Sequence, residues 1–146
     1  MLTKEFDFVI YPLKLIITVG MTYEDIVDRF ENKEEECAEW SDKKDFEYKA
    51  SFVNLVYDKS DGLYKILWWF NNTHEMTMRN ICHESFHVSM SVCQYCNMSL
   101  GFKVGEDEHA AYIAGFAGNC AGLMFNELKD NENGNNEKEN NDKEKE

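Results

Sequence analysis

Five consecutive residues on one predicted helix, His83-Glu84-Ser85-Phe86-His87, have the types and spacing of a metal site. At 3.6 residues per turn, His83 and His87 lie one turn apart on the same helix face. Two neutral imidazoles so placed can bind one zinc ion, and the carboxylate of Glu84 can take a proton from a water that the metal activates. The pattern is the His-Glu-x-x-His motif, and it predicts a zinc site with Glu84 as catalytic base.

The motif lies in an apolar stretch, residues 76–98, that contains neither proline nor glycine. Two stripes run through it at helical spacing: Ile81, Ser85, Val88, Val92 and Tyr95, and beside them Cys82, Phe86, Ser89, Cys93 and Cys96. This pattern predicts a central, mostly buried helix. One metal ion would satisfy two histidines and a glutamate in a dry interior, whereas the alternative is two satisfied core histidines beside an exposed glutamate.

A zinc site of this kind needs a third protein ligand, and the next predicted helix offers Glu108. That helix opens with acidic residues, which the helix dipole favours in a first turn. Small residues follow Glu108 at spacings of three and four, namely Ala111, Gly115, Gly118 and Gly122. The stripe predicts close packing on the motif helix, with Glu108 at the mouth of the interface and the phenol of Tyr112 in the same cleft. A solvated first-turn acid is the alternative for Glu108.

His109 and Cys93 are the rival candidates for the third ligand. His109 projects about 100° away from the stripe that contains Glu108, and Cys93 lies nearly two turns from His87 on an unbroken helix. The extended motif that takes all three ligands from one segment does not fit, because Met90 and Cys93 stand where it requires glycine and histidine.

The chain resembles the gluzincin metallopeptidases in their smallest single-domain form, as found in phage and mobile-element genomes. Three segments carry the resemblance: the motif itself, Glu108-His109-Ala110-Ala111-Tyr112 some twenty residues later, and Phe6-Asp7-Phe8-Val9-Ile10-Tyr11-Pro12 before an apolar strand. It covers most of residues 5–128. The resemblance implies zinc bound by His83, His87 and Glu108, Glu84 as base, and a small sheet packed on the motif helix.

Length and composition predict one domain over residues 1–128 and a disordered acidic tail over residues 129–146. The 146 residues are 43% hydrophobic and 14% aromatic, which is enough apolar material for one core. The tail has no apolar residue to bury. The formal net charge of −13 disfavours nucleic acid and anionic membrane surfaces as partners.

The sequence predicts a cytoplasmic protein with reduced thiols. No hydrophobic run approaches the ~18 residues of a membrane span, and the start Met1-Leu2-Thr3-Lys4-Glu5 lacks the form of a secretory signal. The five cysteines are an odd number and lie mostly on apolar helical faces. Cys93-Gln94-Tyr95-Cys96 is the exception, since this spacing can hold a metal or act as a redox pair, but buried thiols are favoured.

Before the motif helix, strand and helix patterns alternate. Residues 6–11, 13–19, 50–57 and 63–70 are β-rich, and the last two are joined by an Asp-Gly turn as in a hairpin. Thr22 caps a helix over residues 23–32, and the charge-dense residues 31–47 continue that helix or form a loop. We therefore expect a zincin-like α+β fold, with a mostly antiparallel sheet of three to four strands packed on the motif helix and the Glu108 helix.

A sheet edge beside the metal would let an extended peptide add as a further strand, with its scissile carbonyl over the zinc. We expect residues 63–70 to form that edge because they lead directly towards the motif helix. Trp68 and Trp69 point to opposite faces of this strand, so one is expected in the core and the other in the cleft.

Two functions fit these features. The first is a zinc-dependent peptidase that hydrolyses a peptide or protein substrate. The second is a non-catalytic acidic binding protein on the same scaffold, which acts on a host or phage protein.

Overall fold

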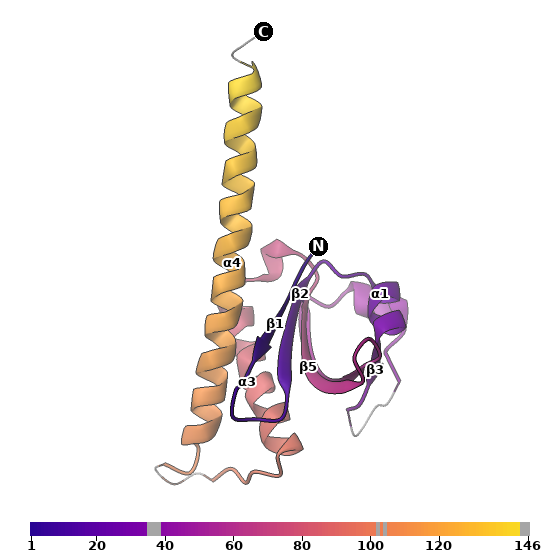
Figure 1. Ribbon diagram of the computed structural model, residues 1–146, viewed down its shortest axis with the longest axis vertical. Coiled ribbons are helices and arrows are strands. Elements are labelled where there is room, and N and C mark those ends of the chain that lie inside the picture. The colour runs from indigo at the N-terminus through magenta and orange to yellow at the C-terminus, as the bar shows by residue number, and fades with distance from the viewer. Residues whose placement is uncertain (35–38, 102, 104, 144–146) are drawn as a thin grey trace.

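The computed structural model describes residues 1–34, 39–101, 103 and 105–143, with side chains described as far as Asn131. The elements in chain order are β1 (Leu2–Asp7), β2 (Lys14–Val19), α1 (Tyr23–Arg29), β3 (Phe30–Asn32), α2 (Lys43–Glu47), β4 (Ser51–Asp58), β5 (Leu63–Phe70), the 3₁₀ turn η1 (Thr73–Glu75), α3 (Met78–Tyr95) and α4 (Glu108–Lys143) (Figure 1). The fold is therefore α+β, which confirms the class predicted from the sequence.

The sheet has five strands in the order β1-β2-β5-β4-β3, against the three to four expected. It is mixed, because β2 runs parallel to β5 while the other neighbours are antiparallel. The extra strand is β3, which takes the last residues of the helix expected over residues 23–32. Its Phe30 is only 1% exposed, so burial of this side chain outweighs continuation of the helix.

Two predictions from short sequence patterns, a helix cap and a hairpin turn, are confirmed by the structure. Thr22 caps α1, and its hydroxyl oxygen accepts the backbone N–H of Asp25 at 3.2 Å. The Asp-Gly turn joins β4 to β5 as a hairpin, in which Gly62 has a φ of 75° and donates its N–H to the carbonyl of Asp58 at 2.8 Å. Both features depend on residues a few positions apart, which is why the sequence alone predicts them.

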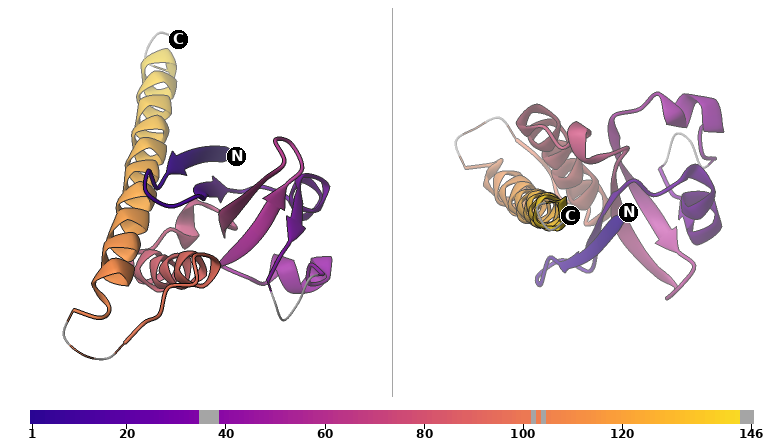
Figure 2. Two further views of the ribbon diagram at one scale, coloured as in Figure 1. Left: turned by 60° about the horizontal axis from the view of Figure 1, so that its bottom comes forward. Right: turned by 90° about the horizontal axis from the view of Figure 1, so that it is seen from above.

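Two hydrophobic cores lie on opposite faces of the sheet. Helices α3 and α4 cover one face and α1 and α2 cover the other (Figure 2). Trp68 is 0% exposed on the α3 side and Trp69 is 2% exposed on the α1 side. The two rings do point to opposite faces, but the prediction that one of them lines the cleft beside the metal is wrong, since both lie in hydrophobic cores and neither lines the hollow at the motif.

Helices α3 and α4 run in opposite directions and pack together on the sheet (Figure 1). The buried residues of α4 are Ala110, Ile113, Ala117, Cys120, Ala121 and Met124. Of the predicted stripe of small residues, Gly118 faces α3, where an added Cβ would lie 3.7 Å from Ser85 Oγ. An added Cβ at Gly115 or Gly122 would meet nothing within 4 Å. The contact face of α4 is therefore rotated away from the stripe that contains Glu108.

Helix α4 continues through Lys143, across most of the segment for which we predicted disorder. Its C-terminal part extends past the rest of the fold (Figure 1). The last apolar side chain is Leu128, which packs on the core that α3 and α4 share with the sheet. In the described part of the chain, no helix has both the length and the apolar character needed to cross a bilayer.

Truncation after Leu128 is expected to leave the melting temperature nearly unchanged, because the removed residues carry no apolar side chain. Truncation after Gly122 is the matched comparison, since it also removes Met124, which is 0% exposed. We expect that shorter chain to lose more than about 10 °C in a thermal melt followed by circular dichroism. A comparable loss in the first truncation would show that residues after 128 dock on the domain.

Candidate metal centre

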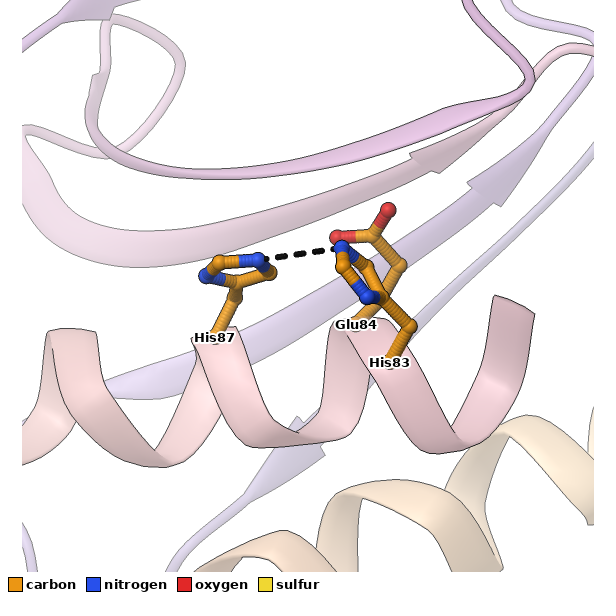
Figure 3. A group of neighbouring side chains, drawn as sticks. All are labelled: His83, Glu84 and His87. Carbon is orange, nitrogen blue, oxygen red and sulfur yellow. Dashed lines mark hydrogen bonds between the residues drawn. The ribbon is translucent and has the colours of Figure 1, made fainter. Parts of the chain in front are cut away.

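His83 and His87 face the same side of α3, and their Nε2 atoms are 3.2 Å apart (Figure 3). A tetrahedral zinc ion with two imidazole ligands places their nitrogens about 3.3 Å apart. At this distance one ring can donate its N–H to the other, and a bound ion would replace that hydrogen bond. The pair therefore fits zinc with little movement, as the spacing in the sequence predicted.

Glu84 completes a group of three potential metal ligands. The ligand atoms of His83, Glu84 and His87 lie within 4.8 Å of one another, and no other such group occurs in the described part of the chain. Glu84 is 7% exposed, whereas both histidines are exposed. The expectation of a mostly buried motif helix is thus correct for one face of α3 only, because the histidine face is open to solvent.

Ser51 at the start of β4 binds the motif from the sheet. Its Oγ donates a hydrogen bond of 2.7 Å to Glu84 Oε1. Among the described residues, the Glu84 carboxylate accepts no other hydrogen bond and forms no ion pair.

The three motif side chains point from α3 towards the sheet and away from α4 (Figure 3). They line an open hollow of about 300 Å³ together with Lys49, Ser51, Phe52 and Val53. One wall of this hollow is therefore the beginning of β4, and the floor is the exposed face of α3. The ammonium of Lys49 lies over the ring of Phe52 and donates to Ser41 Oγ at 3.5 Å.

Among the residues that the structure describes, β4 has an open edge at Ser51 and Val53, on the side that faces β3. Strand β3 pairs with β4 only from Val56 to Asp58. Leu55 is also occupied on that side, since its carbonyl accepts from Lys33 N and its N–H donates to Glu34 Oε1. Because backbone groups alternate in direction along a strand, those of Val53 and Ser51 point the same way as those of Leu55. Within the described residues, no backbone group pairs with them on that side.

The prediction that residues 63–70 form the edge of the sheet beside the metal is wrong. Strand β5, which comprises residues 63–70, lies in the middle of the sheet between β2 and β4. The hairpin turn brings β4, and not β5, to the outside beside the motif. Strand order depends on pairings between distant segments, so the closeness of β5 to α3 in the sequence was misleading.

Glu108 does not join the histidines in this structure. It begins α4, it is exposed, and at 100° per residue it lies about 180° around the helix from Ala117, which is buried against α3. It also precedes Gly118, the neighbour of Ser85, by about 15 Å along the helix axis. Tyr112 lies one turn after Glu108 and is 75% exposed.

The two rival ligands also lie outside the group. Cys93 is 2% exposed in the core, and burial raises the pKa of its thiol, which disfavours the thiolate that a metal requires. His109 is half-buried in the first turn of α4, and its Nε2 has no hydrogen-bond partner among the described residues. Of the cysteines within the described residues, Cys93 and Cys120 are buried as expected, whereas Cys82 is exposed and Cys96 is half-buried; Cys37 lies outside those residues.

No sequence pattern pointed to Lys49, Ser51 or Val53 as neighbours of the motif, because each lies 30 or more residues before it. Only the packing of α3 against β4 brings them together. A larger hollow of about 400 Å³ lies elsewhere, between the β1–β2 turn and the β4–β5 turn. It contains no group of metal ligands among the described residues.

The chain matches no family model, no curated protein and no solved structure in comparisons with known proteins.

Proposed function

We propose that this chain is a zinc-dependent peptidase with a zincin-like scaffold, in which His83 and His87 bind the metal and Glu84 is the catalytic base. The observation that carries the proposal is the pair of Nε2 atoms 3.2 Å apart beside a buried carboxylate. Two imidazoles and a carboxylate are donors that zinc prefers. The resemblance to small gluzincins from phage and mobile-element genomes supports the same assignment.

Each motif residue has a defined part in hydrolysis. Zinc bound here would act as a Lewis acid towards a peptide carbonyl and would lower the pKa of a water molecule. Glu84 then accepts the proton of the attacking water and passes it to the leaving amine. Its position suits this transfer, because within the described residues Glu84 is the one carboxylate grouped with the two histidines.

Among the described residues, no strand pairs with β4 at Ser51 and Val53, and this open edge supports a peptide as the substrate. An extended chain would add as a strand beside Ser51 and Val53, using their outward backbone groups. This position would lay the peptide across the hollow, over His83 and His87. Strand addition then stops at Leu55, where Lys33 and Glu34 already occupy the edge.

One observation favours the second candidate, a non-catalytic binding protein. Within the described residues, the group of metal ligands contains two histidines and one carboxylate, and Glu108 lies outside it. With Glu84 as base, zinc would hold only two protein ligands and would bind weakly. Glu108 would complete the site only if the first turn of α4 moved when the metal bound.

Zinc titration of the purified protein tests the metal site directly. We expect one zinc per chain, and more than about 100-fold weaker binding in His83→Asn and His87→Asn, because each variant loses one imidazole ligand. His74→Asn is the matched control, since His74 is exposed on η1 outside the group. Equal affinity in all three variants would rule out the site.

The same titration decides the third ligand. Weaker zinc binding in Glu108→Gln, with no change in the neighbouring Asp107→Asn, would identify Glu108 as a ligand. Unchanged zinc binding in both variants would mean that water takes the third ligand position. That result would favour the non-catalytic binding protein.

A further inference from the structure

The hydrogen bond from Ser51 to Glu84 joins the sheet to the motif. Ser51 Oγ and Glu84 Oε1 are 2.7 Å apart, although the residues are 33 positions apart in the chain. An ionised carboxylate only accepts hydrogen bonds, so the serine hydroxyl is the donor. The contact therefore holds one carboxylate oxygen and leaves the other free.

Ser51 is itself held firmly. It is the first residue of β4 and pairs with Phe70 of β5. The preceding carbonyl, that of Ala50, accepts the N–H of Asn71 at 3.0 Å. Its side chain points to the face that α3 covers, as does that of Val53, which packs on the core there. The backbone that carries the hydroxyl is thus fixed on the sheet, opposite the longer side chain of Glu84.

Rotation of this carboxylate would change what it does. The three ligand atoms of the group lie within 4.8 Å of one another, while two ligands of one tetrahedral zinc lie about 3.3 Å apart. A free Glu84 side chain can close that difference by turning about its own bonds. It would then bind the metal as an anionic ligand and would be lost as a base.

We propose that Ser51 is a positioning residue that holds the Glu84 carboxylate beside the metal and out of its coordination shell. This inference rests on the metal site proposed above. Serine hydroxyl and metal compete for the same carboxylate, and the sheet keeps the hydroxyl in place. Because Ser51 acts on the metal only through the Glu84 carboxylate, we expect that substitutions of the two residues will not act independently on zinc affinity.

Zinc affinity of the full chain, measured by competition with a chromophoric chelator, tests the proposal without an activity assay. Glu84→Gln alone is expected to bind zinc within about threefold of the unsubstituted protein, because Ser51 already keeps Glu84 off the metal. Ser51→Ala is expected to bind about tenfold more tightly, because the released carboxylate becomes a ligand. Adding Glu84→Gln to Ser51→Ala should remove that gain.

Two further variants serve as controls. Ser51→Thr keeps the hydroxyl and should bind zinc like the unsubstituted protein. Ser91→Ala removes a serine from α3 one turn after His87 and should also change nothing. Circular dichroism melts of each variant separate a folding defect from an effect on the metal.

The outcomes distinguish the two proposals. If the protein binds zinc and Glu84→Gln changes the zinc affinity equally with Ser51 present and with Ser51→Ala, the proposed role of Ser51 is overturned. The metal site would still stand. A failure of the unsubstituted protein to bind zinc would overturn the metal site, and the role of Ser51 with it.

Discussion

Glu84→Gln is expected to reduce peptide hydrolysis on the order of 100-fold or more while zinc remains bound. Glutamine has nearly the same size and still accepts the hydrogen bond from Ser51, which is 2.7 Å long in the unsubstituted protein. It cannot accept the proton of the attacking water. The change therefore removes the base and preserves the surroundings of the metal.

The measurement compares zinc content and cleavage of a quenched fluorescent peptide library, with unfolded casein as a second substrate. Glu47→Gln is the matched control, because Glu47 is exposed at the end of α2. Loss of zinc in Glu84→Gln would mean that Glu84 is a ligand and not the base. Equal rates before and after the change would exclude it as the base, and a zinc-loaded protein that cleaves no member of the library would favour the binding function.

Asp58→Asn is expected to destabilise the fold by about 3 kcal/mol, because it removes the charge that two cations share inside the protein. The Asp58 side chain is 0% exposed, with Arg29 Nη2 at 2.7 Å and Lys65 Nζ at 3.0 Å. Lys65 is 1% exposed and also pairs with Glu5 and Asp61. These contacts join β1, α1 and the β4–β5 hairpin, and so help to hold β4 in register beside α3.

The effect of Asp58→Asn should depend on pH. Burial alone would raise the pKa of Asp58, but the hydrogen bonds from Arg29, Ser60 and Lys65 together hold it well below its usual range. A lowered carboxyl pKa contributes stability that is present above the unfolded value of about 3.9 and is lost as the pH falls below it. The difference between the two proteins should therefore be largest near neutral pH and shrink towards pH 3.

Urea unfolding at pH 7 and pH 3 checks this expectation. Asp61→Asn is the matched control, since Asp61 is 38% exposed and its ion pair with Lys65 should contribute less than about 1 kcal/mol. An equally small effect of both substitutions at pH 7 would contradict a stabilising role for the buried pair.

Some features of this chain depend on residues that are close in sequence, and these could be predicted. His83 and His87 share a face of α3 because helix geometry alone sets their spacing. The cap at Thr22 and the turn at Gly62 follow in the same way from short-range backbone requirements. The α+β class and the two faces of Trp68 and Trp69 come from the periods of helix and strand.

Other features depend on which segments meet, and the sequence left them open or indicated them wrongly. The parallel pairing of β2 with β5 and the place of β4 between β5 and the short strand β3 arise from contacts between separate segments of the chain. Small residues at regular spacing suggested one contact face for α4, but burial of Ile113, Ala117 and Met124 selects another and turns Glu108 outwards. A periodic pattern defines faces of a helix, and only packing decides which of them is buried.

The motif alone therefore determined the pair of imidazoles and the carboxylate between them, because their geometry is internal to one helix. Tertiary structure decided what surrounds them: the hydroxyl of Ser51 on Glu84, the free edge of β4, and the position of α4 on the other side of α3. The reason is physical. Local backbone geometry places residues within a turn or two of one another, whereas residues from separate elements meet only where burial of both hydrophobic cores brings the elements together.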